Sequence, residues 1–170
     1  MKLVFTPDWF LGKDVLIETF SFLVLFTFFI LCMKNYKLDK KKNTLYLGIG
    51  FLLVAVAQLA TMLTKIVLYY DMNFTQNIGN MMVTYNVVKS VDIFYYVGFF
   101  FHRLLTLLGF YIIYKIPKKK SFEDFIFGFY FVILSALFSS SAYFLFHISI
   151  LILLVLIINN YYEIYKKNKF

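Results

Sequence analysis

Long apolar stretches separated by short polar segments dominate this chain. The stretch from Leu45 to Tyr70 carries a single charge, Lys65, and further apolar runs cover 15–33, 93–114 and 125–165. The hydrocarbon core of a membrane, about 30 Å thick, takes about 20 helical residues to cross, and lipid offers no partner for an unpaired backbone group. The pattern therefore predicts membrane-spanning α-helices.

The last run, 125–165, is about twice as long as one span requires. Its polar cluster, Ser139-Ser140-Ser141, indicates a turn between two spans. Composition agrees with the membrane class, since 62% of the residues are hydrophobic and the mean hydropathy is +0.78. We therefore predict an all-α integral membrane bundle of five transmembrane helices in a single membrane domain, 1–170. The predicted spans are 15–33, 45–70, 92–114, 122–139 and 142–165.

The chain has 17 basic and 9 acidic residues. The lysines cluster after the first, third and fifth predicted spans: Lys34, Lys37, Lys40, Lys41 and Lys42; Lys115, Lys118, Lys119 and Lys120; Lys166, Lys167 and Lys169. In a five-helix chain these segments share one side, which the positive-inside rule places in the cytoplasm. We predict inner loops at 34–44 and 115–122 in a cell-membrane protein, with the N-terminus outside and the C-terminus in the cytoplasm. Clustering between spans argues against nucleic acid as a partner.

The segment between the second and third spans predicts an outer amphipathic helix over about 74–89. Its apolar residues recur at spacings of four and three and so share one helix face: Phe74, Ile78, Met81, Tyr85 and Val88. Such a helix either packs on its own bundle or binds another protein or lipid at the membrane surface.

An internal repeat is predicted from the match of residues 36–59 to residues 114–137 without gaps. The identities include Gly50 with Gly128 and the lysine triplets of both segments. Two parallel helix hairpins followed by a fifth helix would explain the match. The alternative is that positive-inside selection alone placed lysines in both loops.

The tract from Tyr36 to Lys42, followed by Leu45-Tyr46-Leu47-Gly48-Ile49-Gly50-Phe51, resembles the first loop of multi-pass sensory regions that precede kinase or cyclase output domains in prokaryotes. The resemblance covers a minor part of the chain. The chain is expected to stop soon after its last helix, without an output domain. The resemblance then implies a detached sensory or partner-binding membrane module.

Polar residues inside the predicted spans are the candidate functional residues, because a charge at the membrane centre costs about 2.5 to 3.5 kcal/mol on insertion scales. They are Glu18, Lys65, Gln58, Thr61, His102, Arg103, Ser135 and His147. Glu18 and Lys65 lie at similar depth on antiparallel spans, which predicts an ion pair. The alternatives are two side chains that extend separately to the interface, or a cation or proton site at Glu18.

Arg103 and His102 lie near the middle of the third predicted span, and Arg103 is the only arginine. Its candidate partners at similar depth are Gln58, Thr61 and Ser135. They predict a polar cluster that locks the bundle, with an anion or acidic-headgroup site as the alternative. His147 is predicted about two turns shallower than His102 on the fifth span, which argues against haem ligation by the two histidines.

No soluble catalytic pattern occurs in the sequence. It has no phosphate-binding glycine loop, no paired carboxylates within a predicted span and no metal-ligand spacing. An intramembrane enzyme is the least favoured class, since it would have to use Glu18, His102 or His147. No cofactor and no metal ion are expected.

Two function classes remain ahead of the others. A non-catalytic sensory, scaffold or partner-binding membrane protein fits the sparse polar interior and the amphipathic segment. The alternative is a small transporter or channel subunit for an ion or small solute, which fits parallel repeats. The expected partners are the lipid bilayer and either a second copy of the chain or another membrane protein.

Overall fold

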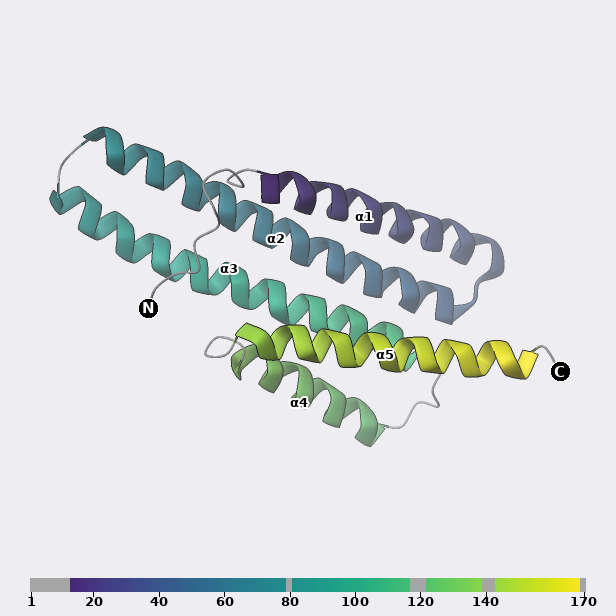
Figure 1. The fold of residues 1–170 in the computed structure, drawn as a ribbon. Helices are drawn as coiled ribbons and strands as arrows, with labels where there is room; N and C mark the ends of the chain where they lie inside the picture. The colour runs from purple at the N-terminus through teal and green to yellow at the C-terminus, as the bar shows by residue number, and fades with distance from the viewer. Residues whose placement is uncertain (1–12, 79–80, 117–121, 139–142, 169–170) are drawn as a thin grey trace.

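The computed structural model describes residues 13–78, 81–116, 122–138 and 143–168, with side chains over 13–67, 95–116, 126, 128–138 and 144–166. Every secondary-structure element in these residues is an α-helix, which confirms the all-α prediction. The helices are α1 (Lys13–Asp39), α2 (Lys42–Ile78), α3 (Met81–Lys115), α4 (Phe122–Phe138) and α5 (Tyr143–Asn168). Figure 1 shows them side by side in an elongated bundle.

Four helices are long and apolar enough to cross a membrane. The qualifying segments are Lys13–Asp39, Lys42–Val67, Tyr95–Lys115 and Phe144–Lys166. The exception is α4, whose 17 residues reach about 25 Å at 1.5 Å per residue. The described helices therefore fit a membrane protein, with four candidate spans.

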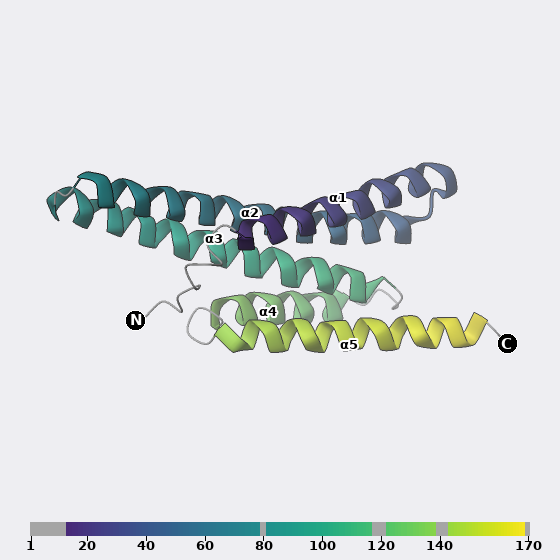
Figure 2. The same ribbon diagram turned by 45° about the horizontal axis from the view of Figure 1, so that its top comes forward.

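The helix α3 lies at the centre of the bundle. It packs along α2 on one side, and α1 packs on α2 in turn. On its other side α3 contacts α4 and α5, which also contact each other. Figure 2 shows this arrangement, with α1 and α2 on one side of α3 and the α4–α5 pair on the other.

Small residues bring α2 and α3 into close contact. A Cβ added at Gly109 would lie 2.8 Å from the Gly50 carbonyl oxygen, and Gly98 lies so close to Thr64 that no Cβ fits there. Lipid gives helices no hydrophobic reason to associate, so close packing of small residues supplies much of the attraction. We call this contact the α2–α3 seam, defined by Gly50, Gly109, Gly98 and Thr64.

Large apolar side chains join α3 to α4 and α5. The buried cluster consists of Leu107, Tyr111, Val132, Phe146 and Leu153. Within this contact Gly128 of α4 lies against the ring of Tyr111.

The contacts of the two glycines matched in the predicted repeat are not equivalent. Gly50 of α2 meets Gly109 and Ile113 on the following helix, whereas Gly128 of α4 meets Tyr111 on the preceding helix. A parallel repeat would direct both glycines to corresponding neighbours. The lengths of α2 and α4, 37 and 17 residues, also differ. The helix contacts therefore do not reproduce the sequence match.

The turn between α1 and α2 is shorter than the predicted 34–44 loop. The first helix continues to Asp39 and the second begins at Lys42, so only Lys40 and Lys41 connect them. Lys40 has a φ of 51°, and its N–H donates to the Tyr36 carbonyl at 2.8 Å, which caps the end of α1. Long lysine side chains can reach water from a helix end, so the polar segment need not leave the helix.

The helices α2 and α3 extend past the start of α1 (Figure 1). They contain 37 and 35 residues, which correspond to more than 50 Å at about 1.5 Å per residue. The predicted single amphipathic helix over 74–89 is instead divided between the end of α2 and the start of α3. Its side chains lie outside those described, so its apolar face stays a prediction.

The α1–α2 turn, the end of α3 and the C-terminal end of α5 lie at the same end of the bundle (Figure 1). The lysines of these segments whose side chains are described are Lys34, Lys37, Lys40, Lys41, Lys42, Lys115 and Lys166. We call this the lysine-rich end. The starts of α1, α3 and α5 point toward the opposite end.

Candidate functional site

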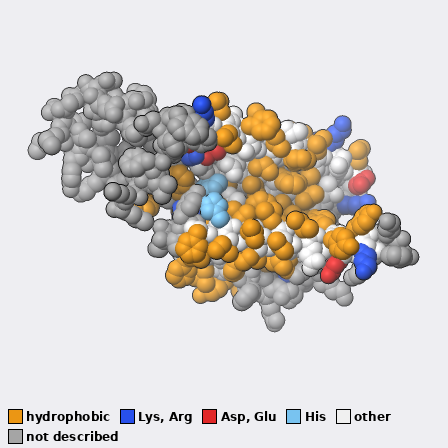
Figure 3. Space-filling view, in the orientation of Figure 1, with side chains coloured by type: hydrophobic (Ala, Val, Ile, Leu, Met, Phe, Trp, Pro, Cys, Tyr) orange, Lys and Arg blue, Asp and Glu red, His pale blue; other side chains and the backbone are white. Residues whose placement is uncertain are grey.

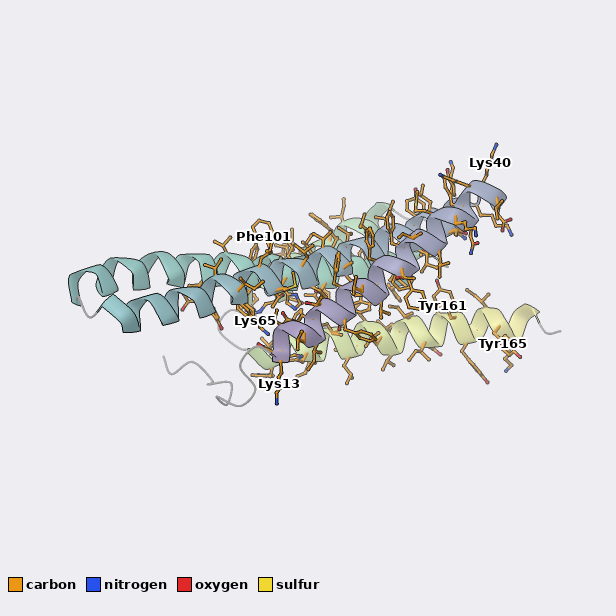
Figure 4. All side chains as sticks on the ribbon, turned by 90° about the horizontal axis from the view of Figure 1, so that it is seen from above. Lys13, Lys40, Lys65, Phe101, Tyr161 and Tyr165 are labelled. Atoms are coloured by element: carbon orange, nitrogen blue, oxygen red, sulfur yellow. The ribbon has the colours of Figure 1, made fainter. Side chains whose placement is uncertain are left out.

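Lys65 on α2 lies between two carboxylates of α1. Its Nζ is 2.5 Å from Oε1 of Glu18 and 2.9 Å from Oδ2 of Asp14. The side chains of Lys65, Glu18 and Asp14 are only 20%, 15% and 10% exposed. Figure 4 shows Lys65 between α2 and the start of α1. The predicted pair of Glu18 and Lys65 is present, and Asp14 joins it.

Helix geometry explains how this charged cluster of Asp14, Glu18 and Lys65 forms. Asp14 and Glu18 are four residues apart and therefore share one face of α1. The antiparallel α2 brings Lys65 beside that first turn, where it offsets the repulsion between the two carboxylates. Oε2 of Glu18 is buried and accepts no hydrogen bond from the described residues.

Asp14 was missed in the sequence because the predicted first span began at Val15. The helix begins two residues earlier, at Lys13, which places Asp14 inside it. Two acids at a helical spacing, opposite a lone lysine on the next span, are the pattern that could have revealed the cluster.

An open groove of about 500 Å³ runs between α1 and α5, with α2 and α3 as its floor. Its polar lining residues are Ser21, Gln58, His102, Thr106 and His147. Phe20 and Phe146 form aromatic walls. Figure 3 shows the histidine side chains gathered on this face. The volume lies within the range of small-molecule sites, about 300 to 1,000 Å³.

The ring of His102 is held from two directions. Its Nδ1 lies 3.1 Å from the carbonyl oxygen of Ala57 on α2, and its ring meets that of Phe146 edge-on at 5.6 Å between centroids. A carbonyl oxygen only accepts, so Nδ1 carries the proton. In the neutral ring Nε2 is then a hydrogen-bond acceptor.

The groove brings together His102 and His147, which the sequence analysis placed at different depths. That depth prediction was wrong because it counted from a third span starting at residue 92. The helix α3 begins at Met81 and passes beyond the starts of α1 and α5. His102 therefore lies farther from the lysine-rich end than the count of residues along the span predicted, and it is level with the second turn of α5.

Arg103 is buried, at 8% exposure, as its position in the span predicts. Within the described residues, however, no hydrogen bond joins it to Gln58, Thr61 or Ser135. The Thr61 hydroxyl donates to the Ala57 carbonyl at 3.2 Å inside its own helix, Gln58 lines the groove, and Ser135 is half-buried on α4. These three residues therefore do not form the predicted polar cluster with Arg103.

The described side chains include no group of three or more His, Cys, Asp or Glu residues that could bind a metal ion. The chain matches no known protein family, no curated protein and no solved structure. The fold, with four apolar helices, fits the class of helical membrane proteins. Any more specific function has to be argued from the charged cluster, the seam and the groove.

Proposed function

We propose that this protein is a non-catalytic, multi-pass membrane module that senses its membrane, acts as a scaffold or binds a partner. The observation that carries the proposal is the use of its buried polar side chains in helix contacts. Lys65 joins α2 to two acids of α1, and His102 joins α3 to a carbonyl of α2. The Thr64 hydroxyl donates a hydrogen bond to the Ala60 carbonyl within its own helix, and Thr64 is 2% exposed at the α2–α3 seam. Polar contacts of this kind hold helices together inside a membrane.

The surface that we propose for a partner is α1. Only Asp14 and Cys32 of this 27-residue helix are buried, so most of its apolar side chains face outward. Lipid covers such a surface readily, and so does another transmembrane helix. We propose that the partner is a second copy of this chain, with another membrane protein as the alternative.

Photo-crosslinking in native membranes tests this proposal. Benzoylphenylalanine at Leu16, 70% exposed on α1 and outside the groove lining, should give a product, and at Ile158, 67% exposed on α5, it should give none. A product with the mass of two chains supports the second copy, whereas a larger or smaller product indicates another protein. Equal labelling at both positions, or none at either, would contradict a partner on α1.

We further propose five spans in a cell membrane, with the N-terminus outside and the lysine-rich end in the cytoplasm. The proposal is supported by the gathering of the lysines at one end of the bundle, together with the positive-inside rule. In a Cys32→Ser background, cysteines at Asn43 and Lys13 should react from opposite sides of intact cells. Reaction of both from outside would contradict this topology, and reaction at Asn43 alone from outside would reverse its orientation.

A small transporter or channel subunit is the second candidate, favoured by the partly polar groove. Liposomes containing the purified full-length chain provide the test. A proton or potassium flux above that of empty liposomes, removed by Val24→Trp in the groove, would replace the first proposal with this one. Absence of flux together with the crosslink at Leu16 supports the partner-binding module.

A further inference from the structure

Most polar lining residues of the groove between α1 and α5 lie toward one end, beside Phe20 and Phe146, and the other end is apolar. Because α1, α3 and α5 run toward the lysine-rich end, their earlier residues Ser21, His102 and His147 share the far end of the groove. Their later residues Leu25, Phe110 and Ile150 lie toward the lysine-rich end. The antiparallel α2 follows the same division, with Gln58 at the polar end and Val54 at the apolar end.

The groove lining contains no Asp, Glu, Lys or Arg among the described residues. Its polar groups are neutral hydrogen-bonding groups, and the neutral His102 ring leaves Nε2 as an acceptor while Ala57 fixes the ring orientation. A charged ligand would lose its solvation here without gaining an opposite charge. A ligand with a small uncharged donor and acceptor group would match the polar end.

We propose that this groove binds an uncharged amphiphile of the lipid class. Its head, a hydroxyl or amide, lies between His102 and His147, and donates to Nε2 of His102. Its hydrocarbon chain follows Leu25, Phe110 and Ile150.

The dimensions agree with such a ligand. From His102 to Phe110 the groove follows α3 for two turns, roughly 12 Å at 1.5 Å per residue. That length and a volume of about 500 Å³ hold a small head and part of a chain. The groove is open along one side, so the ligand can enter from the surrounding bilayer. The site does not depend on the proposed function, since a sensor and a transporter could both use it.

A photoreactive probe tests the site in the full-length chain in lipid nanodiscs. The probe is a diazirine-bearing analogue of dodecanol, compared with the alkyl sulfate and the alkyl trimethylammonium of the same chain. The alcohol should label groove residues and be displaced by unlabelled dodecanol. Val24→Trp fills the groove, and we expect it to lower labelling about fivefold or more. Val56→Trp is the control, because Val56 is similarly exposed, 43% against 38%, but lies outside the groove.

The polar end is tested separately. His102→Phe keeps a ring beside Phe146 but removes the acceptor, so it should reduce labelling by the alcohol. The two charged probes should label the unaltered groove only weakly, and His102→Phe should not change that labelling. Gln58→Leu provides a second variant if His102→Phe folds poorly. Equal labelling of the Val24 and Val56 variants, or stronger labelling by either charged probe, would overturn the proposal. A crosslink between two copies at position 24 would assign the groove to a protein contact instead.

Discussion

The two sides of α3 are held together by different kinds of contact. Toward α2, the backbones approach each other through glycine and threonine, and Gly50 and Gly109 leave no space for a Cβ. Toward α4 and α5, large side chains such as Leu107 and Phe146 interdigitate. A contact between backbones cannot adjust, whereas a contact between side chains can relax by changing rotamers. The α1–α2–α3 side should therefore be the rigid part of the molecule and the α4–α5 side the adaptable part.

The largest expected effect is at the charged cluster on the rigid side. Lys65→Gln leaves Asp14 and Glu18 facing each other in a mostly buried position, which should cost about 3 to 5 kcal/mol of unfolding free energy. Glu18→Gln should cost less, because Asp14 still neutralises Lys65. The unfolding midpoint in mixed detergent micelles measures both losses.

The matched control replaces all three charges, by Asp14→Asn, Glu18→Gln and Lys65→Gln together. This triple variant should be more stable than Lys65→Gln alone, because it leaves no uncompensated charge. If the three single losses simply add up in the triple variant, the cluster is not an interacting unit and the rigid side is held by the seam alone.

The next effect compares a glycine on each side of α3. Gly109→Ala places a Cβ 2.8 Å from a backbone oxygen of α2, whereas Gly128→Ala meets only the ring of Tyr111. Both substitutions overpack a contact, which typically costs about 1 to 3 kcal/mol, and we expect Gly109→Ala to cost the more of the two. Unfolding midpoints of the two variants provide the measurement.

A second substitution separates the two cases. Tyr111→Leu should recover stability lost in Gly128→Ala, because it removes the ring that the new methyl group meets. In contrast, Val54→Ala should recover little in Gly109→Ala, since the Gly50 carbonyl remains in place. Equal recovery on both sides would remove the distinction between a rigid and an adaptable side.

Hydropathy was sufficient to predict the helices and their order, because crossing a membrane requires long apolar helices whatever their neighbours are. Depth along antiparallel spans was sufficient to pair Glu18 with Lys65. The groove could not be predicted from the sequence, because its walls come from α1 and α5. Both helices are apolar on all faces, so their sequences do not indicate which side of the bundle each one occupies. Asp14 and His147 were misjudged for a simpler reason, namely that both depended on where a helix begins.

The smallest expected effect concerns the turn that closes the rigid side. Lys40 adopts a left-handed conformation that costs a residue with a side chain about 1 to 2 kcal/mol. Lys40→Gly removes this cost but loosens the unfolded chain, so the net gain in unfolding free energy should be below about 1 kcal/mol. Lys40→Ala is the matched control, because it removes the same charge but keeps the Cβ that makes the left-handed conformation costly. It should give no gain in stability. A higher unfolding midpoint in Lys40→Gly alone would establish that the left-handed conformation of Lys40 carries the effect, and equal gains in both variants would attribute it to the lost charge.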